Sequence, residues 1–285
     1  MTDLRTVPKV DMVSDVMTRW VVTVPLPDSL LQARDLMTRS RVSQLVVVDQ
    51  RNRPIGLISK RDIARFLLED PTTRPLRDIK VSEATSKSIP TIKPDFPVFN
   101  AARMFDIENL AYSVVTGEPP LSGIITETDL CYYFSQKWPG KFKVRDLALG
   151  DFIFAKSSYP VVHVAQAIVY KQPSVPVIDE ELVGILTLTD LLSIREKVPE
   201  VMHSHLFGSK RGNETALIRT GDLMTRDPVT TIPESDLAQA AHIITTKGIG
   251  SLPVVDNERK VVGLLTKHDI VKALGRLGRS ITIEG

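Results

Sequence analysis

Four short stretches of this 285-residue chain place a hydroxyl three residues before an aspartate. Each stretch opens with a glycine, which leaves room for another backbone, and continues with two apolar residues typical of a buried strand. The hydroxyl and carboxylate therefore stand at the start of a helix, where unpaired amides favour a phosphate and an ionised carboxylate can accept hydrogen bonds from a ribose diol. The stretches are 56–62, 123–129, 184–190 and 263–269, with Ser59 and Asp62, Thr126 and Asp129, Thr187 and Asp190, and Thr266 and Asp269.

The same spacing also fits a capping box, in which hydroxyl and carboxylate satisfy the amides of their own helix. Repetition does not separate the two readings, because a cap would recur as faithfully as a binding site. The residues between hydroxyl and aspartate discriminate better. They are Lys60 and Arg61 in the first copy, Glu127 and Thr128 in the second, Leu188 and Thr189 in the third, and Lys267 and His268 in the last.

The first and last copies thus place cationic donors beside a phosphate. The second and third lack added positive charge and are expected to take adenosine-like ligands of low charge or to stay empty. The alternative for Lys60, Arg61 and Lys267 is a solvated helix surface, and for His268 a plain exposed histidine.

The elements that position these residues recur with the stretches, at intervals of roughly sixty to eighty residues. Each copy reads as strand, helix, strand, strand, helix, with a hairpin between the last two strands. The helix is clearest in the last copy, where Leu237, Ala240, Ala241 and Ile244 follow helical spacing behind Pro233 and Ser235. The predicted fold class is α/β (α+β): four repeats, each a small sheet of about three strands with two helices.

A repeat of this size is marginal alone, so neighbouring repeats should dock through their sheets. We expect two modules, 1–140 and 141–285. The predicted segments are repeat 1 at 1–72, repeat 2 at 73–140, repeat 3 at 141–198, a linker at 199–219 and repeat 4 at 220–285.

The sequences Asp-Val-Met-Thr at 15–18, Leu-Pro-Val-Val-Asp at 252–256 and Gly-Leu-Leu-Thr-Lys-His-Asp at 263–269 closely resemble the cystathionine-beta-synthase (CBS) domain. The resemblance covers nearly the whole chain in four copies. It implies that two repeats pair into a disc-like Bateman module with clefts that commonly bind adenosine compounds. It also implies a free-standing energy or metabolite sensor that regulates something else.

The same resemblance implies that the first strand and the turn before the central strand form the walls of the adenine pocket. Backbone N–H and C=O groups of these segments can form hydrogen bonds with the edge of the adenine. Trp20 could stack on a base or simply pack. In repeat 3, Gln172, Pro173 and Ser174 hold this place, and Pro173 lacks a backbone donor. The other wall residues are Thr18, Trp20, Val21, Val42, Ser43 and Gln44 in repeat 1, Leu110, Ala111 and Tyr112 in repeat 2, and Thr225, Pro228, Val229, Ile249, Gly250, Ser251 and Leu252 in repeat 4.

Composition narrows the class of protein. The chain has a net charge of +2, no apolar run long enough for a membrane span and no secretory signal, so we expect a soluble cytoplasmic protein. The single cysteine, Cys131, is expected to be a packed thiol, and His203 and His205 lack further ligands for a metal site.

These observations favour a non-enzymatic protein that binds AMP, ADP or ATP, and the sequence requires no metal for this binding. We expect the faces of the modules to bind a protein partner or a second copy of the chain. Sensing of S-adenosylmethionine or methylthioadenosine is the first alternative. A nucleic-acid-binding regulator that uses Lys210 and Arg211 is the second. An enzyme ranks last, because the repeats leave no length for a catalytic barrel of about 250 residues.

Overall fold

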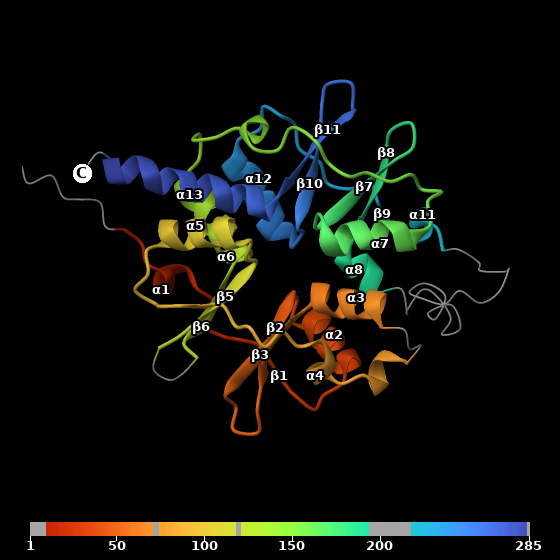
Figure 1. Cartoon of the computed structure of the whole chain (residues 1–285). Coiled ribbons are helices and arrows are strands. Elements are labelled where there is room, and N and C mark those ends of the chain that lie inside the picture. Colours follow the sequence, from red (N-terminus) through yellow and green to blue (C-terminus); the bar gives the residue numbers. More distant parts are fainter. Residues whose placement is uncertain (1–9, 71–73, 118–120, 194–217, 284–285) are drawn as a thin grey trace, which may run out of the picture.

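The computed structural model describes residues 10–70, 74–117, 121–193 and 218–283. Repeats 1 and 2 follow the predicted order of elements (Figure 1). Repeat 1 comprises α1 (Val13–Val16), β1 (Thr23–Pro25), α2 (Leu30–Arg39), β2 (Gln44–Val48), β3 (Pro54–Ser59) and α3 (Lys60–Glu69). Repeat 2 comprises η1 (Leu76–Asp78), α4 (Val81–Ala84), β4 (Thr91–Ile92), α5 (Val98–Glu108), β5 (Tyr112–Val115), β6 (Gly123–Thr126) and α6 (Glu127–Lys137).

Repeats 3 and 4 keep the helices and the hairpin, but their own first strand is reduced to one parallel bridge, Ala155 to Val177 and Thr231 to Val254. Repeat 3 comprises η2 (Val144–Asp146), α7 (Val161–Tyr170), β7 (Ser174–Ile178), β8 (Leu182–Thr187) and α8 (Leu188–Leu192). Repeat 4 comprises α11 (Thr220–Leu223), β9 (Thr225–Arg226), α12 (Leu237–Lys247), β10 (Ser251–Val255), β11 (Val261–Thr266) and α13 (Lys267–Ile283).

The predicted hairpins are confirmed: β2 and β3, β5 and β6, β7 and β8, and β10 and β11 pair in antiparallel fashion. The amphipathic helix predicted in repeat 4 is also confirmed. Leu237, Ala240, Ala241 and Ile244 are at most 1% exposed. The N-cap of this helix is Asp236, whose side chain accepts a hydrogen bond from an amide of the first turn.

The short segment that leads into each repeat packs on the other repeat of its pair. The amide of Val13 donates to the carbonyl of Phe96, and that of Val81 to Asp28. The glycine that opens each hydroxyl-aspartate stretch permits this exchange, as predicted: a Cβ on Gly123 or Gly184 would lie 2.8 or 2.9 Å from the carbonyl oxygen of Thr18 or Thr225. The exchanged segments are α1, α4, η2 and α11 with the residues that follow them.

The sheets of successive repeats face each other. Val46, Val48 and Leu57 of repeat 1 pack with Val114 of repeat 2 in one buried cluster. In the other pair, the buried hydroxyls of Ser174 and Ser251 lie 2.5 Å apart.

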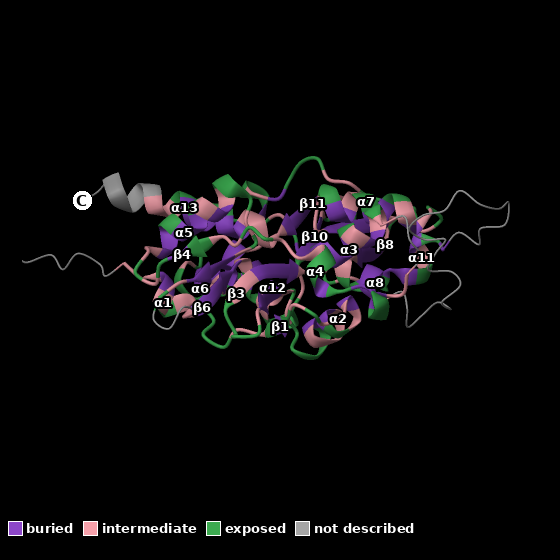
Figure 2. Ribbon diagram, turned by 60° about the horizontal axis from the view of Figure 1, so that its bottom comes forward, coloured by how far each residue is buried: buried purple, intermediate pink, exposed green. Residues whose placement is uncertain are grey.

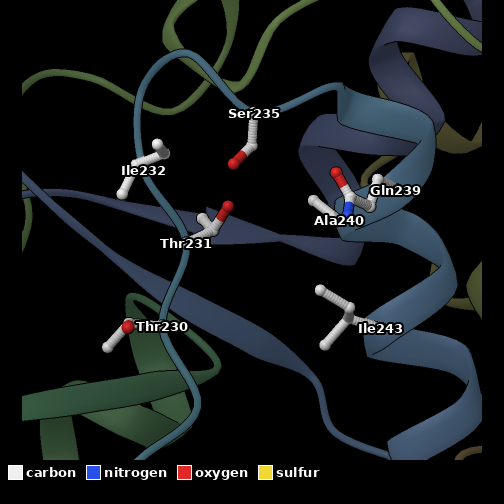
Figure 3. A pocket seen from close by; sticks show the side chains of 7 residues that line it. All are labelled: Thr230, Thr231, Ile232, Ser235, Gln239, Ala240 and Ile243. Carbon is white, nitrogen blue, oxygen red and sulfur yellow. The ribbon is translucent and has the colours of Figure 1, made fainter.

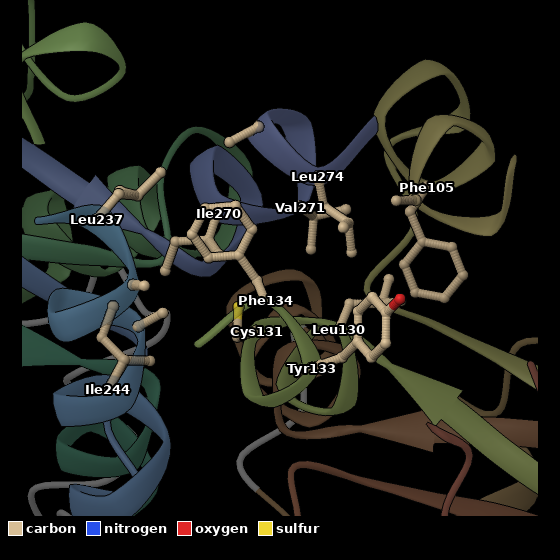
Figure 4. Close-up of a cluster of buried hydrophobic side chains, with 14 of the residues drawn as sticks. Phe105, Leu130, Cys131, Tyr133, Phe134, Leu237, Ile244, Ile270, Val271 and Leu274 are labelled. Atoms are coloured by element: carbon tan, nitrogen blue, oxygen red, sulfur yellow. The ribbon is translucent and has the colours of Figure 1, made fainter. Parts of the chain in front are cut away.

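The helices join the two pairs to each other. Repeats 2 and 4 share a core among α5, α6, α12 and α13 (Figure 4), whereas α3 of repeat 1 lies against α7 and α8 of repeat 3 (Figure 1). Buried residues line the inner faces of these elements, and exposed residues lie on the outer helix faces and loops (Figure 2). Within the described residues, no helix is both long and apolar enough to cross a bilayer.

Candidate functional site

All four aspartates cap their own helices. In each copy, Oδ2 accepts a hydrogen bond from the preceding hydroxyl at 2.6–2.7 Å and from the amide of that Ser or Thr at 2.8–2.9 Å. The capping reading is therefore realised in every repeat. A carboxylate has a second oxygen, however, and Oδ1 remains for other partners. We name the four places the Asp62, Asp129, Asp190 and Asp269 sites.

The outer oxygens differ from site to site. Thr18 donates to Oδ1 of Asp129 at 2.8 Å, and Thr225 donates to Oδ1 of Asp190 at 3.0 Å. Arg65 donates to Oδ1 of Asp62 at 2.6 Å. Among the described residues, no donor bonds Oδ1 of Asp269. The Asp269 site thus holds the one carboxylate oxygen of the four that a ligand could reach without displacing a protein bond.

The predicted grouping of Thr18 with repeat 1 and of Thr225 with repeat 4 is wrong. The two threonines belong to exchanged leading segments, so Thr18 completes the Asp129 site and Thr225 completes the Asp190 site. A single sequence carries no signal for this exchange, because every repeat offers its neighbour the same strand pattern.

Tyr112 also lies across a repeat boundary. It starts β5 of repeat 2, yet its hydroxyl lies beside Ser59 and Asp62 of repeat 1. Burial raises the pKa of Tyr112 to about 12, and the Asp62 carboxylate adds to the shift. Tyr112 is therefore a wall of the Asp62 site and not, as grouped from the sequence, of a site in repeat 2.

The helix starts offer fewer amides than the sequence analysis assumed. The first helical amide donates to the turn before the central strand: Lys60 to Ser43, Glu127 to Ala111 and Lys267 to Gly250, at 2.9, 3.0 and 3.3 Å. The third helical amide donates to the capping hydroxyl. An anion at these starts must therefore depend on side-chain cations more than on backbone donors.

The two lysines reach across to the opposite pair of repeats. Nζ of Lys60 donates to Oγ1 of Thr189 at 3.2 Å, and Nζ of Lys267 donates to Oγ1 of Thr128 at 2.8 Å. Burial lowers the pKa of Lys60, and the charge of Lys267 lowers it further. Lys60 and Lys267 were predicted to supply positive charge to repeats 1 and 4 alone. They also bring positive charge to the helix starts of repeats 3 and 2. The expectation that these two starts lack positive charge is wrong.

His268 is neither a plain exposed histidine nor free to bind phosphate. Its Nδ1 lies 3.2 Å from Glu127 and its Nε2 lies 3.5 Å from Asp106, both in repeat 2. The hydrogen bond to Glu127 raises the pKa of His268 against the opposing effect of burial. The imidazole therefore bridges the two pairs of repeats.

The other predicted wall residues vary in exposure. Trp20 is 92% exposed, so the packing alternative is wrong for it. The hydroxyl of Ser251 is bonded to Ser174, and Leu252 is fully buried, which leaves only its backbone for a ligand. Cys131 is buried, as expected. The residues with at least partial exposure are Val21, Val42, Ser43, Gln44, Arg61, Leu110, Ala111, Thr128, Thr189, Pro228, Val229, Ile249 and Gly250.

Three further residues lie at or beside these sites without having been predicted from the sequence. Arg65 bonds Asp62, and Ser86 holds the position in its leading segment that Thr18 and Thr225 hold in theirs. Leu149 pairs with Gly263, one residue out of that register. The repeated Met-Thr motif could have pointed to Ser86 and Leu149, since each follows the same short helical turn. Predicted residues His203, His205, Lys210 and Arg211, with most of the linker, lie outside the described residues.

A separate hollow of about 210 Å³ lies in repeat 4 between the 230–235 segment and α12 (Figure 3). Sites for drug-sized ligands are about 300–1,000 Å³, so this hollow is too small for a nucleotide. Its lining residues are Thr230, Thr231, Ile232, Ser235, Gln239, Ala240 and Ile243.

The order of elements, the paired sheets and the aspartate sites define a CBS-domain protein. The family profile described as "CBS domain" matches residues 13–69, 81–136, 144–197 and 221–276, and the chain belongs to this family.

Archaeal proteins of similar length resemble it. Protein MJ1225 of Methanocaldococcus jannaschii is 27% identical over 267 residues, which cover 88% of this chain and 94% of the relative. Its crystal structure, described as that of a candidate archaeal homologue of g-AMPK, covers 92% of this chain and 99% of the other at a TM-score of 0.80. A conserved protein of Pyrococcus horikoshii is 21% identical, covers 93% of this chain and 100% of the other at a TM-score of 0.62, and shares the fold.

Proposed function

We propose that this chain is a non-enzymatic cytoplasmic sensor of adenine nucleotides, AMP, ADP or ATP, with the Asp269 site as its principal site. The outer oxygen of Asp269 carries the proposal. Burial of this carboxylate raises its pKa, and no protein donor bonds that oxygen among the described residues. A ribose diol supplies the two donors that such an acceptor lacks.

The lysines supply the second half of the recognition. Lys60 and Lys267 start their helices, and each reaches a threonine of the opposite pair of repeats. A phosphate that accepts from these ammonium groups would form charge-assisted hydrogen bonds, which are worth about 1.5–3 kcal/mol each. S-adenosylmethionine and methylthioadenosine share the ribose and adenine but bring no phosphate, so the lysines favour the nucleotide. The description of MJ1225 as a candidate archaeal homologue of g-AMPK supports a regulatory role.

The sensing mechanism follows from where the lysines are bonded. Lys60 holds Thr189, and Lys267 holds Thr128, so each lysine joins the two pairs of repeats. A phosphate that draws the lysines away from these threonines changes the relative stability of two arrangements of the pairs of repeats. The ligand then shifts the population toward the arrangement that it binds more tightly. The changed surface is then read by a protein partner.

Calorimetric titration with AMP, ADP, ATP and S-adenosylmethionine tests the proposal. Asp269→Asn keeps an oxygen for the helix cap but turns the outer acceptor into a donor, so AMP affinity should fall at least about tenfold with little change in melting temperature. Asp256→Asn, which alters an exposed turn of the same repeat, serves as the matched control. Unchanged AMP affinity in Asp269→Asn would show that the aspartate is a cap alone. S-adenosylmethionine outcompeting AMP would favour the alternative ligand.

A further inference from the structure

Arg65, on the helix that Asp62 helps to cap, forms a hydrogen bond with the outer oxygen of Asp62, Oδ1. Nη2 of Arg65 lies 2.6 Å from Oδ1 of Asp62, one helical turn away on α3. The Asp62 side chain is 10% exposed and that of Arg65 is 45% exposed, so the carboxylate is buried while the guanidinium reaches the surface. Both Asp62 oxygens are thus engaged, Oδ2 by the cap and Oδ1 by the guanidinium.

The exchanged leading segment makes no hydrogen bond to Oδ1 of Asp62 within the described residues. In repeats 2 and 3, by contrast, Thr18 and Thr225 of such segments donate to Oδ1 of the aspartate. Ser86 pairs with Leu57 as Thr18 pairs with Ile124, so the two residues hold the same place in their segments. The Ser86 hydroxyl, however, donates to the carbonyl of Ser88 at 3.3 Å and not to Asp62. In the described parts of the chain, Arg65 is therefore the one partner of Oδ1 of Asp62.

No other repeat places an arginine at this position. Tyr132 and Ser193 stand three residues after Asp129 and Asp190, and Lys272 stands three residues after Asp269. The charge of Lys272 slightly opposes the raised pKa of Asp269, but its ammonium makes no hydrogen bond to that carboxylate within the described residues. A planar guanidinium holds a carboxylate in fixed geometry, whereas an exposed ammonium is a mobile point charge.

We propose that Arg65 is a specificity-determining residue that keeps the Asp62 site closed to an adenosine-type ligand, so that the Asp269 site fills first. The inference rests on the proposed function of the Asp269 site. A ribose must displace the guanidinium to reach Asp62, whereas it meets an open acceptor at Asp269. The Asp62 site then responds only at higher ligand concentration.

The test uses the full chain with Asp269→Asn, which silences the principal site, and AMP as the probe in calorimetry. Arg65→Met should raise AMP affinity at the Asp62 site at least about tenfold, which corresponds to about 1.4 kcal/mol. Arg65→Lys, which copies the arrangement of repeat 4, should give an intermediate gain. Arg53→Met is the matched control, because it removes an arginine from another Arg–Asp pair of repeat 1 and should change nothing.

Adding Asp62→Asn should abolish the gain, and melting temperatures confirm that the variants stay folded. Equal or weaker AMP binding in Arg65→Met, or a gain that survives Asp62→Asn, overturns the inference. The proposed function fails separately, when Asp269→Asn in the otherwise native chain leaves AMP binding unchanged.

Discussion

The two places where helices join the pairs of repeats are built differently. Between repeats 2 and 4, one continuous apolar core includes the fully buried Phe134, Ile244 and Val271 (Figure 4). Gly275 and Gly278 lie against Arg103 and Phe99 on α5, where a Cβ would be crowded, so α13 and α5 approach closely.

The contact between repeats 1 and 3 is thinner and more polar. Among the residues that the structure describes, Val169 and Leu192 are the buried side chains of repeat 3 that enter the core of repeat 1. Leu188 and Leu68 add partly buried packing on the two sides. Hydrogen bonds run from Tyr170 to Glu69 at 2.7 Å and from Arg34 to the Leu192 carbonyl at 3.5 Å, besides the bond from Lys60 to Thr189. Elements with few buried apolar contacts open at low free-energy cost. The difference indicates that the repeat 2 and 4 contact holds the chain together while the repeat 1 and 3 contact opens at lower free-energy cost.

The largest expected effect is at the repeat 2 and 4 contact. Phe134→Ala should lower the free energy of unfolding by about 3–5 kcal/mol, because it leaves a cavity in a shared core. Urea denaturation followed by circular dichroism measures this loss. Phe154→Ala, at a 53% exposed position, is the control and should stay within about 0.5 kcal/mol. A loss below about 1 kcal/mol for Phe134→Ala would contradict the comparison.

Leu192→Ala should cost less, about 2 kcal/mol, because its side chain is 6% exposed at the edge of the repeat 1 core. Hydrogen exchange should become faster in α3 and α8 while α6 and α12 keep their protection. Ile107→Ala, at a 74% exposed position, is the control. Equal acceleration in α6 and α12 would show that the two contacts open together.

Tyr170→Phe removes one exposed hydrogen bond across the repeat 1 and 3 contact. The free energy of unfolding should fall by only about 0.5–1 kcal/mol, in line with the net value of a hydrogen bond. Tyr159→Phe, whose hydroxyl has no partner among the described residues, is the matched control. A loss as large as that of Leu192→Ala would mean that polar bonds, not apolar packing, dominate this contact.

The smallest expected effect is the pH dependence set by His268. Its pKa is raised above the ordinary 6.5 by the bond to Glu127, so its contribution to stability is complete below pH 6.5 and is lost as pH rises through the raised pKa. His268→Gln should therefore cost a few tenths of a kcal/mol at pH 5.5 and nothing at pH 8.5. Urea titrations at both pH values measure the difference, with His163→Gln as control. A cost that is the same at both pH values would exclude the protonated bridge.

Repeat period and apolar spacing predicted much of the local structure. The hairpins, the helix at Leu237 and the caps at Ser59 and Thr266 follow from residues close in sequence, because strand alternation, helical spacing and capping are local properties. The partners of Thr18, Tyr112 and Lys60 could not be predicted in this way. Each lies in another repeat, and four similar copies give no local signal for which copy is the neighbour.

The sequence by itself determined that the chain repeats one CBS-like unit four times and that each unit presents a hydroxyl and a carboxylate at a helix start. Only the tertiary structure decided which carboxylate oxygen stays open. That outcome depends on exchanged leading segments, which bring Thr18 to Asp129 and Thr225 to Asp190, and on Arg65, which folds back on Asp62. The physical reason is that a cap forms within one helical turn, whereas the second oxygen bonds to whatever the packing of the repeats and the neighbouring side-chain rotamers bring within reach.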